Sequence, residues 1–173
     1  MGMGTTFHPR VEGNVPAATR AADYRAGALA GLAAGVAMSF IMMALTTFMM
    51  NMGPWAAPKM AWSLVTGPEV IRPGFEMGPV MGGMVVHLGL STMFGLVFAW
   101  LASVVPLGDV ALGMLYGFGL YVTNLVLVPK LLPGWAGHMY PPNGMMHVMS
   151  ALEHAFFGLV VGWAYHAWRK RWL

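Results

Sequence analysis

Four ionisable side chains in the apolar part of the chain have types and positions that could support chemistry: His87, His147, Glu153 and His154. Glu153 is the only carboxylate well inside an apolar stretch, and an ionisable group in hydrocarbon is costly unless it has a partner or a cavity. His147 and His154 would lie on nearly the same helix face, two turns apart. Such groups can bond neighbouring helices together, bind a metal or haem, or pass a proton. These three possibilities stay open.

Methionine is the second candidate for chemistry, because the chain contains 18 of these residues. Soft thioethers combined with imidazoles suit Cu(I). Candidate copper ligands gather in one short region: His138, Met139, Met145, Met146, His147 and Met149. Two imidazoles from facing helices, His87 with His147 or His154, could instead hold a haem b. Methionine is also a flexible apolar filler, so a protein without a cofactor is the simpler interpretation.

No motif of a catalytic site is present. The sequence lacks a phosphate-binding loop, a zinc-protease motif and a nucleophile elbow, so we expect a protein that is not an enzyme. Cysteine is absent, which excludes disulfides, iron–sulfur clusters and thiolate metal sites. The formal charge of +3 does not indicate nucleic-acid binding, because six of the nine basic residues lie in the two terminal segments.

Composition indicates the environment that must position these residues. The chain is 58% hydrophobic and 9% charged, whereas a soluble domain carries about 25% charged residues. Four stretches reach the roughly 20 apolar residues that a membrane-spanning helix needs: 26–50, 79–105, 110–128 and 144–168. Proline, which lacks a backbone donor, lies in each break. We predict an all-α integral membrane protein, a bundle of four transmembrane helices preceded by a polar tail over residues 1–25.

Charge predicts the orientation of these spans. Four spans place both termini on one side, and the basic terminal segments favour the cytoplasmic side for both. The loops at the other ends would then face outward. Within the first of these loops, residues 57–65 are predicted to form a short interfacial helix.

The second and fourth predicted spans contain a repeated segment. Residues 94–100 and 157–163 are identical at five of seven positions, which predicts two repeated helical hairpins, 26–105 and 110–168, related by an axis along the membrane normal. Glycines spaced by four let helix backbones approach closely. The predicted packing glycines are Gly27, Gly31, Gly35, Gly95, Gly113, Gly117, Gly158 and Gly162. They predict a tightly packed bundle without a wide pore.

Several short motifs carry a family resemblance. They are residues 113–117, Leu127–Val128–Pro129, the segment 153–158 that begins Glu-His, the basic residues 169–171, and His87 early in the second span. With these motifs the chain resembles the YagU-type group of small bacterial inner-membrane proteins. The resemblance implies four spans, a proline after the third, early histidines in the second and fourth, and location in a bacterial inner membrane. It implies topology and no mechanism.

These observations favour a non-catalytic accessory or structural subunit of a larger inner-membrane complex, such as one of respiratory electron transport. The predictions of no soluble domain, no catalytic motif, short loops and glycine-faced helices leave such a chain little to bind except lipid and other helices. Its expected partners are therefore the lipid bilayer with other membrane subunits, or further copies of itself. A haem or copper protein and a small transporter or channel are the alternative hypotheses.

Overall fold

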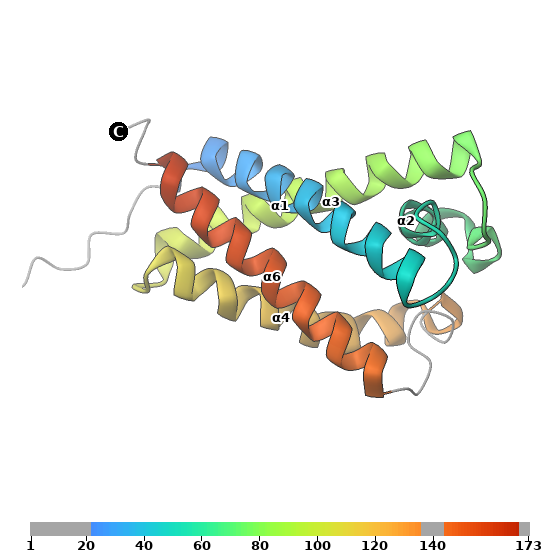
Figure 1. Cartoon of the computed structure of the whole chain (residues 1–173). Coiled ribbons are helices and arrows are strands. Elements are labelled where there is room, and N and C mark those ends of the chain that lie inside the picture. Colours follow the sequence, from blue (N-terminus) through green and yellow to red (C-terminus); the bar gives the residue numbers. More distant parts are fainter. Residues whose placement is uncertain (1–21, 136–143, 170–173) are drawn as a thin grey trace, which may run out of the picture.

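The computed structural model of the chain describes residues 22–135 and 144–169, which contain helices and no strand. The helices are α1 (Tyr24–Phe48), α2 (Ala56–Thr66), the short 3-10 helix η1 (Pro68–Val70), α3 (Met77–Val104), α4 (Asp109–Leu131) and α6 (Gly144–Arg169) (Figure 1). Four of them, α1, α3, α4 and α6, are long and apolar enough to cross a membrane. The predicted all-α bundle of four long helices is confirmed.

The helix boundaries differ most from prediction at the end of α4. The third span was expected to end before Pro129, but α4 continues through this proline to Leu131. A proline removes one backbone donor and disturbs one turn. Because Pro129 lies in the last turn, the helix loses little, and the N–H of Leu132 still donates to the carbonyl of Val128 at 2.8 Å. The expected short helix near residues 57–65 is present as α2.

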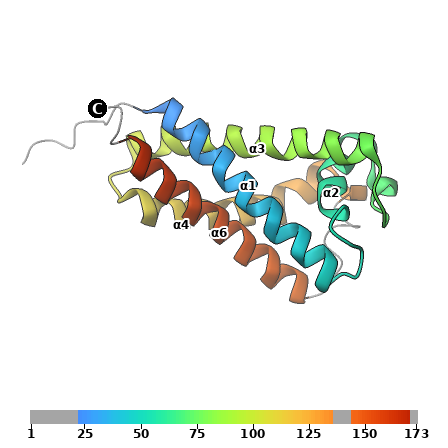
Figure 2. The same cartoon turned by 45° about the horizontal axis from the view of Figure 1, so that its top comes forward.

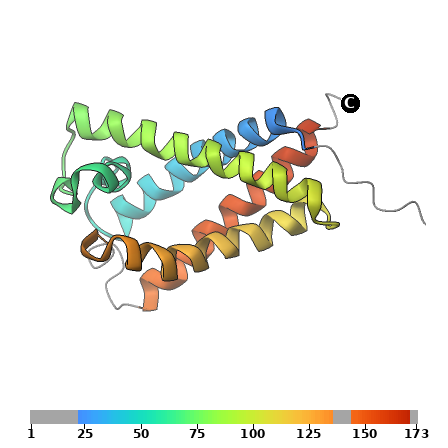
Figure 3. The ribbon, with the colours of Figure 1, turned by 180° about the vertical axis from the view of Figure 1, so that it is seen from behind.

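The long helices form two antiparallel pairs, α1 with α3 and α4 with α6, and α1 also packs against α6 (Figure 2). α1 begins and α6 ends at the same end of the bundle, which we call the termini end; the turn between α3 and α4 lies there too (Figure 1). We call the opposite end the α2 end. From behind, α3 and α4 diverge from their shared turn towards the α2 end (Figure 3), and α2 packs there mainly on α3.

Both pairs are held at glycine contacts where the helix backbones touch. A Cβ atom added to Gly27 would lie 2.6 Å from the carbonyl oxygen of Gly95, and one on Gly31 would meet the carbonyl of Ser91. In the second pair, a Cβ on Gly158 would meet the carbonyl of Gly113. Gly117 and Gly162 make similar backbone approaches, and a Cβ on Gly35 would meet the side chain of Ser91. The helices are therefore closer than any side chain at these positions would allow.

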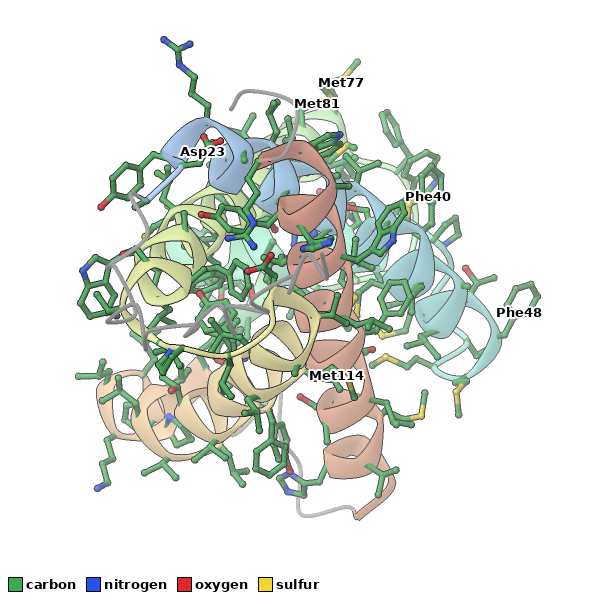
Figure 4. The ribbon with its side chains drawn as sticks, turned by 90° about the vertical axis from the view of Figure 1, so that its left-hand side faces the viewer. Asp23, Phe40, Phe48, Met77, Met81 and Met114 are labelled. Atoms are coloured by element: carbon green, nitrogen blue, oxygen red, sulfur yellow. The ribbon has the colours of Figure 1, made fainter. Side chains whose placement is uncertain are left out.

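The buried core lies in the half of the bundle nearer the termini end. Ala26, Ala30 and Ala34 of α1 are fully buried with Phe98 of α3 and Val161 of α6. Large apolar side chains cover the outside, for example Phe40 and Phe48, which are 71% and 85% exposed and point away from the bundle (Figure 4). An apolar exterior around a small-residue core fits a protein whose solvent is lipid.

Candidate polar sites in the helix bundle

His154 forms a hydrogen-bonded contact between α6 and α4. Its Nδ1 lies 2.7 Å from the carbonyl oxygen of Ser150, and its Nε2 lies 2.8 Å from Nδ2 of Asn124. A carbonyl only accepts, so Nδ1 carries the hydrogen, and Nε2 accepts from the Asn124 amide. The ring of Tyr121 lies 6.1 Å away. Both ring nitrogens are thus used to bond within the bundle.

His87 forms the corresponding polar contact between α3 and α1. Its Nε2 donates to the backbone carbonyl of Gly35 at 3.0 Å, an oxygen that also accepts from the hydroxyl of Ser39 at 3.0 Å. His87 therefore contacts the α1 backbone, whereas His154 contacts a side chain of α4. No hydrogen bond or ring contact joins the two histidines in the part of the chain that the structure describes.

The predicted ligand sets for haem and copper remain predictions. Among residues 22–135 and 144–169, no group of three or more histidines and carboxylates is placed to hold a metal. A ligand at Nε2 of His154 would have to displace Asn124. His147 and Met149 lie partly buried early in α6. His138 and Met139, and the side chains of Met145 and Met146, fall outside the described part.

The structure contains an ion-pair cluster at the termini end that was not predicted from the sequence. Asp109, the first residue of α4, has a side chain only 1% exposed, and its Oδ2 accepts from Arg169 Nη2 at 2.7 Å and from His166 Nδ1 at 2.8 Å. The guanidinium of Arg169 lies 5.7 Å from the centre of the Tyr165 ring. The hydroxyl of Tyr165 accepts from the backbone N–H of Asp23 at 3.3 Å. The cluster connects α1, α4 and α6.

The signal for this cluster was present in the sequence. Antiparallel neighbours place the start of one helix beside the end of the other, so an acid at the start of the third span and bases at the end of the fourth must meet. A carboxylate at a helix N-terminus is also favoured by the helix dipole. Asp109 and Arg169 satisfy both conditions.

A second ionic cluster fixes the loop between α2 and α3. The side chain of Lys59 is fully buried, and its Nζ donates to Glu76 Oε1 at 2.7 Å and to the Arg72 carbonyl at 3.1 Å. Nε and Nη2 of Arg72 donate to the two oxygens of Glu76, each at 2.9 Å. Hydrogen bonds from Arg72 and then Lys59 lower the pKa of Glu76 to about 2. A charge-assisted, bidentate arginine–carboxylate pair of this kind is geometrically specific.

α2 itself is seated on glycines of α3. The six-membered ring of Trp62 covers Gly82, and the carbonyl of Pro58 occupies the place that a Cβ on Gly83 would need. Between α2 and the residues after α4 lies an open hollow of about 420 Å³, lined in part by Leu64, Leu131 and Trp135. Among the described residues that line it, none has an ionisable side chain.

Glu153 is the exception among the predicted site residues. It lies partly buried on α6 beside His154. Within the described residues its carboxylate makes no hydrogen bond and no ion pair. His87 and His154 form hydrogen bonds to neighbouring helices, whereas Glu153 does not.

Comparison of the chain with protein-family models, curated proteins and solved structures gave no match. Function must therefore be inferred from the contacts within the chain itself.

Proposed function

We propose that the chain is a non-catalytic accessory subunit of a larger bacterial inner-membrane complex, such as one of respiratory electron transport. One observation carries the proposal: polar groups of the spans serve as bonds between helices. His87 binds Gly35, Asn124 binds His154, and the hydroxyl of Tyr116 donates to the carbonyl of Phe94 at 2.9 Å. Groups used in this way hold a scaffold together, which supports a structural role.

The exterior supports the same proposal. α4 contacts the rest of the bundle along one narrow face, and its other residues present apolar side chains such as Leu115 and Phe118, 61% and 56% exposed. Helices in lipid associate through packing and polar contacts rather than through the hydrophobic effect. A rigid bundle with wide apolar faces is suited to lying against other membrane helices.

The proposed orientation places both termini in the cytoplasm. Arg25 and Arg169 lie at the termini end. In the sequence they adjoin the basic terminal segments, and basic segments are retained on the cytoplasmic side. A C-terminal fusion to a reporter that is active only in the cytoplasm should be active. A fusion in the loop between α2 and α3 should be inactive.

The test of the proposed role is purification from the native membrane. The tagged chain is extracted in mild detergent and separated on a native gel, with an optical spectrum and mass spectrometry of the band. A band of high mass with reproducible partners is expected. A small colourless band without partners would contradict the proposal, and a small band with a haem spectrum or stoichiometric copper would favour the ligand-binding alternative.

A further inference from the structure

Glu153 has a place in the membrane that requires a partner. It lies nine residues after Gly144 on α6, about 13 Å along the helix axis at 1.5 Å per residue. It is also inside the apolar span His147–Arg169. A carboxylate at such a depth pairs with another group or with water in a cavity, yet no described residue bonds to it.

One side of α6, next to Glu153, is accessible from outside the bundle. Val148, Leu152, Leu159 and Trp163 form an exposed stripe, from 39% to 64% exposed. Glu153 is one residue after Leu152 and so lies about 100° around the helix from the centre of that stripe. Gly158 and Gly162, which contact α4, lie on the other side of the stripe. Glu153 is therefore on the edge of α6 that faces away from α4, partly exposed at the border between this stripe and the buried face that carries Phe157 and Ala164.

Among the described residues, no lysine or arginine is placed to reach it. The basic residues of the described spans lie at span ends: Arg25, Lys130 and Arg169. Lys130 comes six residues after Asn124, the residue that bonds to His154. It is therefore about 9 Å nearer the α2 end than the level of Asn124 and His154. A second copy inserted in the same orientation would bring no lysine or arginine of the described residues to this depth, which points to a different chain as the source of a complementary charge.

We infer that the edge of α6 around Glu153 and Leu152 is a docking surface for a transmembrane helix of another subunit, and that this helix carries a lysine or arginine at the depth of Glu153. The inference rests on the proposed accessory role and names the chemistry of the partner. The ion pair forms in lipid, where water does not compete for it, and it fixes the depth and rotation of the partner helix.

The experiment uses the tagged full-length chain in native membranes. A photo-activated crosslinking residue replaces Leu152, and in a control Val122, which is 41% exposed on α4. The expected crosslink from position 152 falls on a membrane-spanning peptide that contains a lysine or arginine, at least tenfold above the yield from position 122. A crosslinked peptide without a basic residue in its span would overturn the inference.

Variants then test the charge. Glu153→Gln and Glu153→Leu should reduce recovery of the partner at least tenfold, while Val122→Gln leaves it unchanged. Glu153→Lys, combined with a change of the partner's lysine or arginine to glutamate, should restore recovery of the partner. If Glu153→Leu reduces the amount of folded chain, Glu153→Gln alone decides.

Undiminished recovery of the partner with Glu153→Gln would overturn the inference but leave the accessory role standing. Failure to recover any partner with the unaltered chain would overturn both. Proton flux in liposomes that depends on Glu153 would also overturn it, by giving the carboxylate a different role.

Discussion

The two helix pairs are variants of one arrangement in which a serine and a histidine have exchanged places. When Gly95 of α3 is aligned with Gly158 of α6, Ser91 falls on His154 and His87 falls on Ser150. In α3 the serine is next to the glycine contact and the histidine is one turn further away; in α6 the order is reversed. The pairs therefore use the same residue types at the same two positions and obtain different contacts.

The exchange changes what fills the space at the third position of each helix contact. In α1/α3 the small Ser91 allows a third close glycine, since a Cβ on Gly35 would lie 2.6 Å from that of Ser91. In α4/α6 the residue aligned with Gly35 is Tyr121, and His154 fills the space together with Asn124. In the first pair the third glycine, Gly35, thus packs against a small side chain. The second pair keeps backbone contact from Gly117 to the start of α4, where a Cβ on Gly162 would meet the carbonyl of Asp109, and it adds polar side chains and the Asp109 ion pairs.

The largest expected effect is loss of the glycine contacts. Gly95→Leu and Gly158→Leu place side-chain atoms against the backbones of Gly27 and Gly113, which can yield only by separation of the helices. We expect each to lower the free energy of unfolding by about 3 kcal/mol, measured by denaturant titration in mixed micelles. Gly89→Leu on α3 and Gly119→Leu on α4 are matched controls, because a Cβ there meets nothing within 4 Å. Equal losses in controls and test variants would contradict the packing role.

The next largest effect is expected from loss of the Asp109 ion pairs, which belong to the second pair. Asp109→Asn removes the charge shared by His166 and Arg169. Loss of one member of a buried pair costs several kcal/mol, but Arg169 is 18% exposed, so we expect about 2 kcal/mol in the same titration. Asp23→Asn on α1 is the control. Asp23 accepts from the N–H of Ala26 in its own helix, and asparagine caps as well as aspartate does. A cost for Asp23→Asn as large as for Asp109→Asn would argue against the ion pairs.

These contrasts indicate how much of the structure the sequence could predict. Spans and glycine faces follow from local patterns, because hydropathy and a spacing of four are visible within one helix. The helix through Pro129 was missed, because a proline in a last turn and a proline just after a helix have nearly the same sequence signature. The partners of His87 and His154 were missed for another reason. Gly35 O is a backbone atom that every residue has, and Asn124 becomes relevant only when α4 and α6 are in register.

The hydrogen bond between Asn124 and His154 of the second pair can be measured with a double-mutant cycle. Asn124→Leu and His154→Leu, alone and together, should give a coupling free energy of about 1 kcal/mol, within the range for hydrogen bonds between membrane helices. Asn124→Leu combined with His87→Leu provides the control. Because those residues belong to different pairs, their effects should add. Zero coupling between Asn124 and His154 would show that the pair contributes packing rather than a hydrogen bond.

The smallest expected effect concerns the α2 end. There α2 packs on α3 of the first pair, and Lys59, Arg72 and Glu76 form the ionic cluster of the following loop. The pKa of Glu76 is lowered from 4.5 to about 2 by Arg72 and Lys59, so its ionised form is stabilised by folding. That contribution is complete above pH 4.5, decreases as the pH falls towards 2, and is absent below it. The melting temperature of the unaltered chain should exceed that of Glu76→Gln at neutral pH, and the difference should shrink below pH 4.5. Glutamine mimics the protonated carboxyl, so a difference that stays constant from pH 6 to pH 3 would show that folding does not depend on this charge.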